Sequence, residues 1–164
     1  NKSEHERSFL KKHTYYIRLI AFWAVSMLII IGGSIFYKQY QGSEYDKLAI
    51  PYIQNVIPVI SSWDPVATKA LMVPEIAATI PDDKYARAME FFSQLGALQS
   101  LEEPEFTKAH VDQETDIGQQ TILEYKVDAS YENGAAEIDL KLLERGGSFE
   151  IYRFNFSSEV LLPH

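Results

Sequence analysis

The sequence contains no cysteine among its 164 residues, which excludes disulfide bonds, thiolate metal sites and thiol nucleophiles. It also lacks a glycine-rich phosphate loop, a serine nucleophile elbow and an HExxH zinc motif. The four histidines are scattered: two near the N-terminus, one in a polar stretch and one at the C-terminus. We therefore expect no metal, no cofactor and no catalytic residue of these kinds.

Basic residues are scarce after the first quarter of the chain. Residues 42–164 hold nine Lys and Arg against 21 Asp and Glu, whereas residues 1–41 hold six against two. A strongly acidic domain repels nucleic acids and anionic lipid surfaces. The charge distribution therefore argues against DNA or RNA as a partner.

One long apolar run stands between these two regions. The 18 residues from Leu19 to Phe36 carry no charge, and as a helix they and their neighbour Tyr37 would span roughly 28 Å, close to one hydrocarbon core. Signal peptides have shorter apolar regions and end in a small-residue cleavage site, which is missing from Ile35 to Tyr40. A soluble domain of about 120 residues could hardly surround such a helix. The run is therefore predicted to be a retained membrane anchor.

The flanks of the run predict its orientation. Five Lys or Arg residues lie in the first 18 positions, and only Lys38 and Lys47 follow the run at a similar distance. The positive-inside bias then places the N-terminus in the cytoplasm and the remainder outside. We expect a cytoplasmic tail at residues 1–14, a transmembrane anchor at 15–41 and an outer domain at 42–164. The lipid bilayer is thus a predicted partner.

Small residues inside the anchor could also face another helix. Trp23 belongs to an aromatic belt at one interface, while Gly32, Gly33 and Ser34 allow close helix approach although no GxxxG motif is present. A lipid-facing run with incidental small residues explains them equally well. Whether the anchor associates with other subunits or with further copies of the chain stays open.

Helices are predicted in the first half of the outer domain. One begins at Ser43, a capping residue, and bends at Pro51 and Pro58. A second, short helix follows Asp64, and a third begins at Pro81. Apolar residues recur three or four positions apart and predict one apolar stripe along the first helix: Tyr45, Ala49, Tyr52, Val56, Val59 and Trp63.

The second half of the domain changes to the two-residue period of strands. Residues 121–131 alternate, and Asn133-Gly134 then predicts a two-residue hairpin turn. The expected register pairs apolar residues on one face: Tyr131 with Ala136, Ala129 with Ile138, Val127 with Leu140, and Tyr125 with Leu142. On the other face it opposes like charges, which destabilises a sheet: Asp128 with Asp139, and Lys126 with Lys141.

Three further strands are expected around this hairpin. Residues 148–157 form the last strand, and one extra residue near Tyr152 or Arg153 brings its aromatic residues to a single face, as in a β-bulge. Weaker candidates are residues 97–101 and 107–112. Helices followed by antiparallel strands predict an α+β fold, one N-terminal transmembrane helix followed by helices packed on a curved antiparallel sheet.

Residues 44–160 resemble the cystatin-like fold of the nuclear transport factor 2-like superfamily in element order and turn placement. The matching features are Trp63-Asp64-Pro65, Leu95-Gly96-Ala97-Leu98, Tyr131-Glu132-Asn133-Gly134, and Gly147-Ser148-Phe149-Glu150-Ile151. The topology of tail, anchor and outer domain is also similar to inner-membrane scaffold components of type IV secretion systems, which have a larger outer domain. This resemblance implies a bacterial inner-membrane protein with a periplasmic domain.

Enzymes of this superfamily, such as ketosteroid isomerases, place an Asp, His or Tyr between helices and sheet. The corresponding candidates, with the aromatic residue beside them, are Trp63, Asp64, His110, Asp112 and Tyr125. Each also has an ordinary interpretation: Asp64 as a helix cap, His110 and Asp112 as exposed polar residues, and Tyr125 as a core residue. We expect a non-catalytic subunit or assembly factor of a larger membrane complex, with a small-ligand-binding or isomerase-like enzyme as the alternative.

Overall fold

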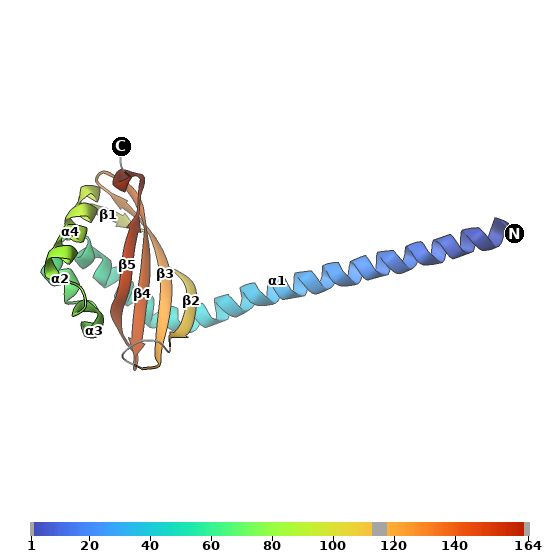
Figure 1. Cartoon of the computed structure of the whole chain (residues 1–164), viewed down its shortest axis with the longest axis horizontal. Helices are drawn as coiled ribbons and strands as arrows, with labels where there is room; N and C mark the ends of the chain where they lie inside the picture. Colours follow the sequence, from blue (N-terminus) through green and yellow to red (C-terminus); the bar gives the residue numbers. More distant parts are fainter. Residues whose placement is uncertain (1, 113–117, 163–164) are drawn as a thin grey trace. The chain divides into compact units, whose positions relative to one another are not determined.

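The computed structural model describes residues 2–112 and 118–162, and within them all side chains except those of residues 2–14, 38, 39, 41, 43 and 112. The chain divides into two compact units, Asn1–Tyr40 and Gln41–His164. The first unit is helical from Lys2, including the segment that carries no helix signal in the sequence. The second unit combines helices with a sheet, which confirms the mixed α+β class (Figure 1).

Helix α1 comprises Lys2–Ile60, so the helix predicted to begin at Ser43 has no N-terminus there. Once a helix has formed, each further residue adds a backbone hydrogen bond without a new nucleation cost. A capping residue is therefore not needed at position 43. Pro51 and Pro58 lie inside this helix, as predicted. The side chain of Ser43 lies outside the described residues.

Shorter helices follow α1 and cover the sheet. They are α2 (Pro65–Lys69), α3 (Pro74–Ala77), α4 (Asp82–Phe92), and the single 3₁₀ turns η1 (Ser93–Leu95) and η2 (Glu159–Leu161). The start of α2 after Asp64 and of α4 after Pro81 are confirmed. Helix α3 has no counterpart among the helices expected from the sequence. Proline favours the first turn of a helix, and Pro74 begins α3.

Five antiparallel strands form one open sheet. They are β1 (Leu98–Leu101), β2 (Glu105–Asp112), β3 (Gln120–Tyr131), β4 (Gly134–Arg145) and β5 (Ser148–Ser157). Strands β3, β4 and β5 are neighbours, while β1 and β2 each pair with β3. Figure 1 shows α2, α3 and α4 together on one side of this sheet. The predicted β-bulge is confirmed, because Lys141 pairs with Arg153 and the next residue, Leu142, pairs with Ile151.

The register of the β3–β4 hairpin differs from the prediction by two residues. Tyr131 pairs with Gly134, so the turn residues are Glu132 and Asn133. The side chain of Asn133 donates to the carbonyl of Gln94 at 2.8 Å, which attaches the turn to η1. A shift of two keeps the same residues on each face, but the outer face gains opposite-charge pairs: Lys126 with Asp139, and Glu124 with Lys141.

The core lies between the inner face of the sheet and helices α1 and α4. The buried stripe of α1 consists of Ala49, Ile53, Val56, Ile57 and Ile60, so the stripe predicted from the sequence was partly wrong. Tyr45 and Tyr52 are only half-buried, and Trp63 follows the helix. On the sheet side, residues such as Val127, Leu140 and Phe156 complete the core. Each such side chain contributes about 1.5–3 kcal/mol by its burial.

Candidate functional site

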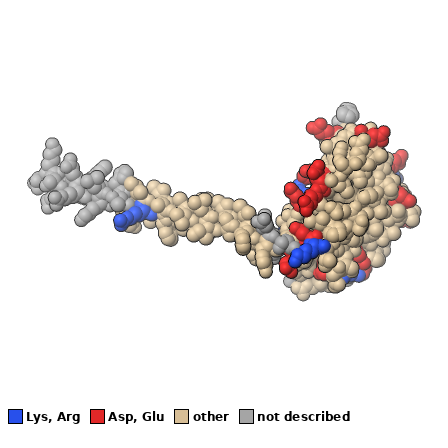
Figure 2. Space-filling model, turned by 180° about the vertical axis from the view of Figure 1, so that it is seen from behind, with Lys and Arg blue, Asp and Glu red and all other residues tan. Residues whose placement is uncertain are grey.

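The N-terminal unit carries the one described helical segment long and apolar enough to cross a membrane. It comprises Tyr15–Tyr37, 23 residues, and none of its most apolar window is buried. Figure 2 shows this stretch without charged side chains after the basic group near its start, whereas acidic side chains are spread over the other unit. Trp23 is 69% exposed. Length and composition are therefore compatible with a membrane anchor.

The small and polar residues of this segment suit an apolar environment. A Cβ atom at Gly32 or Gly33 would meet no atom within 4 Å in the described residues. The hydroxyls of Ser26 and Ser34 donate to the carbonyls of Phe22 and Ile30 at 2.8 and 2.7 Å. Because these hydroxyls are satisfied within the helix, they leave no free donor toward lipid.

Trp63 is held in a structural position. Its backbone has a φ of +60°, and it is the only described non-glycine residue with a positive φ. Its indole Nε1–H donates to the carbonyl oxygen of Gly96 at 3.0 Å. Its ring lies 5.6 Å from that of Tyr131 and 5.4 Å from that of Phe156. The indole thus closes one end of the core, where its N–H has a partner.

Asp64 caps helix α2. Its Oδ1 accepts hydrogen bonds from the backbone N–H groups of Val66 at 2.8 Å and Ala67 at 3.2 Å. These are two of the amides that a helix N-terminus leaves without a partner. The carboxylate is exposed and lies in the capping geometry predicted as its ordinary interpretation.

His110 lies on strand β2 in a charged cluster. Its Nδ1 is 3.7 Å from Oε1 of Glu124, and its side chain is 41% exposed. The ammonium groups of Lys141 and Lys108 lie 3.0 and 3.5 Å from the same oxygen. Burial raises the pKa of Glu124, but the adjacent ammonium of Lys141 and the other neighbouring charges outweigh burial and lower it. The side chain of Asp112 lies outside the described residues.

Tyr125 is a buried core residue, as its ordinary interpretation predicted. Its hydroxyl donates to Oδ1 of Asp46, on helix α1, at 2.8 Å. Burial, and next this hydrogen bond to a carboxylate, raise the pKa of Tyr125 well above its ordinary value. The phenol therefore stays protonated and links helix to sheet.

Packed aromatic rings and paired hydroxyls fill much of the space between helices and sheet. Tyr131 and Ser61 share a hydrogen bond of 2.7 Å, and the Tyr85 hydroxyl donates to that of Thr68 at 3.0 Å. The rings of Phe92 and Phe156 lie 4.9 Å apart in the same layer. The candidate residues therefore do not converge on one cavity: Asp64 caps a helix, His110 lies on an exposed strand and Tyr125 is enclosed.

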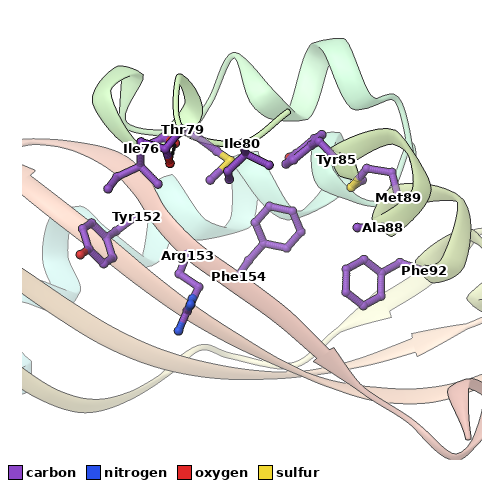
Figure 3. Close-up of a pocket in the computed structure, with 11 residues that line it drawn as sticks. Ile76, Thr79, Ile80, Tyr85, Ala88, Met89, Phe92, Tyr152, Arg153 and Phe154 are labelled. Atoms are coloured by element: carbon purple, nitrogen blue, oxygen red, sulfur yellow. Dashed lines mark hydrogen bonds between the residues drawn. The ribbon is translucent and has the colours of Figure 1, made fainter. Parts of the chain in front are cut away.

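An open apolar pocket of about 400 Å³ lies beside this layer, between α3, α4 and the edge strand β5, and Tyr85 and Phe92 also line it. Figure 3 shows Ile80, Tyr85 and Phe92 facing Phe154 across it, while the side chain of Arg153 points away. Its lining contains no Asp, Glu or His. It can hold an apolar group of small-molecule size but offers no carboxylate or imidazole for acid–base chemistry.

Sequence reasoning did not find this pocket, because its lining comes from segments whose proximity is tertiary. Ile76 belongs to the unexpected helix α3 and Ile80 follows it, while Phe154 reaches the inner face only through the bulge. The four-residue spacing of Ile76 and Ile80 was the available signal.

In the described part of the chain, no group of three or more His, Asp or Glu residues could hold a metal ion. In comparisons with known proteins, no family model and no curated protein matches this chain. The assignment of a function therefore depends on the geometry alone.

Proposed function

We propose that this protein is a non-catalytic, single-pass membrane protein that presents its α+β domain as a binding module, as a subunit or assembly factor of a larger membrane complex. The observation that carries the proposal is the exposed apolar segment Tyr15–Tyr37. An isolated apolar helix of this length has a lipid bilayer as its natural environment.

The hydrogen bonds of the candidate catalytic residues support a binding role for the protein rather than an enzymatic one. A general base needs an accessible reacting proton within hydrogen-bond reach. Asp64 is engaged with backbone amides, and Tyr125 with Asp46. Both residues therefore have structural roles in the fold, and neither of them lines the 400 Å³ pocket.

We further propose a bacterial inner membrane location, with a cytoplasmic N-terminus and a periplasmic domain of cystatin-like, nuclear transport factor 2-like fold. The excess of basic residues before the apolar segment supports the orientation. The order of helices before a five-stranded antiparallel sheet supports the fold.

Membrane fractionation tests the anchor. Replacing Ile29 and Ile30 with Arg in the full chain places two charges in the apolar segment, and we expect the protein to leave the membrane fraction. Leu48→Arg, an exposed residue of α1 outside this segment, serves as the control and should stay in the membrane. Recovery of the double variant in carbonate-washed membranes would contradict the anchor.

Affinity purification of the full chain from native membranes in mild detergent tests the binding role. We expect one or a few membrane proteins to co-purify in fixed ratio, and Gly33→Leu to weaken any association made through the helix. A chain that purifies without other membrane proteins, after cross-linking in intact cells as well, would contradict the role as a subunit.

The pocket supports the alternative of a small-ligand-binding protein. A fluorescent apolar probe such as 1-N-phenylnaphthylamine should then bind the full chain, and Ala88→Trp should abolish binding by filling the pocket. Lys84→Trp, on the same helix but outside the lining, is the matched control. Saturable binding lost only in Ala88→Trp would favour this alternative.

A further inference from the structure

The outer face of the sheet, turned away from α1 and α4, carries a row of basic side chains. The row lies beside a patch that α3 covers, where Val73 and Ile76 pack on Ile122 and Leu143. Lys108, Glu124, Lys141 and Arg153 are register partners across β2, β3, β4 and β5. We call these four residues the basic row. The single carboxylate of Glu124 is shared by the ammonium groups of Lys141 and Lys108, at 3.0 and 3.5 Å.

The basic row has more positive charge than its own carboxylate neutralises. Arg153 directly opposes Lys141, and no described carboxylate lies within ion-pair distance of Arg153. Directly opposed like charges destabilise a sheet. A positive surplus here is unusual in a domain whose charge is strongly negative. The unneutralised positive charge of the basic row is therefore available to a carboxylate of another molecule.

The same face carries an excess of carboxylates at its other end. A hollow of about 70 Å³ is lined by five carboxylates and one ammonium: Glu102, Glu103, Glu105, Asp128, Glu137 and Lys126. We call the five carboxylates the acidic end. Lys126 is paired with Glu137 at 2.6 Å and lies 3.7 Å from Asp139, so the other carboxylates of the acidic end remain in excess.

The two charged regions are arranged so that the face complements itself. Asp128 lies four residues from Glu124 along β3, and Glu137 lies four residues from Lys141 along β4, about 13 Å in each case. The register pair Lys126 and Asp139, which is nearly neutral, lies between the basic row and the acidic end. We call this pair the middle row. A two-fold axis along this middle row would place each basic row over the acidic end of the other copy.

We infer that two copies of this chain associate face to face through the outer sheet surface, with the basic row of each on the acidic end of the other. The occupant is a second copy because the chain itself carries both halves of the complementary surface, at matched spacing. This inference goes beyond the proposed function and does not depend on the membrane anchor or on any third protein.

The contact is weak and sensitive to salt. It is built from exposed charged groups: the side chains of Lys141 and Glu137 are 37% and 42% exposed. Such pairs are screened within about 10 Å at 0.1 M salt and within about 3 Å at 1 M. Confinement of copies to one membrane would raise their effective concentration and favour the pair.

Charge reversal with mixing tests the pairing of the two regions. In the full chain in detergent, the first variant combines Lys141→Glu with Arg153→Glu, and the second combines Asp128→Lys with Glu137→Lys. Each variant alone should be monomeric by sedimentation at low salt, because the first variant makes the basic row negative and the second removes most of the net negative charge of the acidic end. Their equal mixture should form a heterodimer, since each altered region meets its complement.

The matched control carries the same change of charge elsewhere. Lys84→Glu with Arg87→Glu lies on α4, away from the outer face, and should dimerise like the wild type. A wild-type chain that is monomeric at low salt up to about 100 μM would overturn the inference. So would a dimer that both reversed variants still form alone.

A cross-link keeps the inference testable if a reversed variant fails to fold. The chain has no cysteine, so Asn155→Cys introduces a single thiol beside the middle row, opposite Asp139. A short bis-maleimide should join two full-length copies at low salt and lose at least fivefold in yield at 1 M salt. Glu90→Cys on α4 should not be joined, and equal cross-linking at both positions would overturn the inference.

Discussion

The hydroxyl of Tyr125 donates a 2.8 Å hydrogen bond to Oδ1 of Asp46, and this bond joins helix α1 to the middle of strand β3. The two residues are 79 positions apart in the sequence. Close by, the ring of Tyr45 stacks with that of Phe106 at 6.2 Å, and Phe106 packs edge-on to Tyr125 at 5.6 Å. One polar contact and three rings therefore hold the start of the domain to its sheet.

Removal of the phenol tests the strength of this contact. We expect Tyr125→Phe to lower the free energy of unfolding by about 1.5–3 kcal/mol, because Asp46 loses a hydrogen bond to its charged carboxylate. Urea unfolding of the full chain in detergent, followed by circular dichroism, measures the change. Tyr152→Phe, at a half-buried tyrosine of β5, should stay within about 0.5 kcal/mol. Equal losses in both variants would contradict a specific role for the Asp46 contact.

Alkaline pH should destabilise the domain through its tyrosines. Burial, and next the charge of Glu150, raise the pKa of Tyr52 to about 12, whereas an unfolded tyrosine titrates near 10. Above pH 10 the unfolded chain loses this proton first, so it binds fewer protons than the folded chain and the free energy of unfolding falls as pH rises. The contribution of Tyr52 is fully present below pH 10 and is lost as pH rises toward 12.

Urea unfolding at pH 8 and pH 11 checks this expectation. Tyr52→Phe should show a smaller difference between the two pH values than the wild type, while Tyr85, Tyr125 and Tyr131 supply the remaining decrease. A variant whose loss of stability on going to pH 11 equals that of the wild type would show that Tyr52 titrates as in the unfolded chain.

Gly42 permits a close approach between α1 and β2. A Cβ atom at this buried position would lie 3.0 Å from Cδ1 and 3.2 Å from Cβ of Phe106. We expect Gly42→Val to lower the free energy of unfolding by about 1–3 kcal/mol through overpacking. Leu48→Val is the control, because it introduces the same β-branched residue at an exposed position of α1. Its effect should be a few tenths of a kcal/mol.

Substitution of Asp64 distinguishes a helix-capping role from a role as a catalytic base. Asp64→Ala should cost about 1 kcal/mol of stability because the amides of Val66 and Ala67 lose their acceptor. Asp64→Asn retains a capping oxygen and should be nearly neutral. A carboxylate base would show the reverse pattern in function, since Asn removes the base as completely as Ala does. Loss of a ligand-dependent activity in Asp64→Asn with unchanged stability would therefore favour the isomerase-like alternative.

Local patterns predicted most elements of the domain. The alternation in residues 121–131, the capping residue Asp64 and the parity slip near Tyr152 each produced an element or bulge where expected. These features depend on neighbours in sequence: strand pleat, helix-terminal amides and side-chain parity. Where the choice depended on distant partners, the prediction failed. The hairpin turn is attached through Asn133 to the carbonyl of Gln94, 39 positions away, and no local pattern contains this contact.

The sequence by itself determined the division into an apolar segment and an acidic domain, and the class of that domain, because hydrophobic periodicity and charge are properties of single residues and their spacing. Only the tertiary structure decided that α1 runs on past Ser43, that an apolar pocket opens between α4 and β5, and that Lys108, Lys141 and Arg153 lie in one row. These outcomes depend on which strands become neighbours and in which register, and that is settled by the combined packing of segments far apart in the chain.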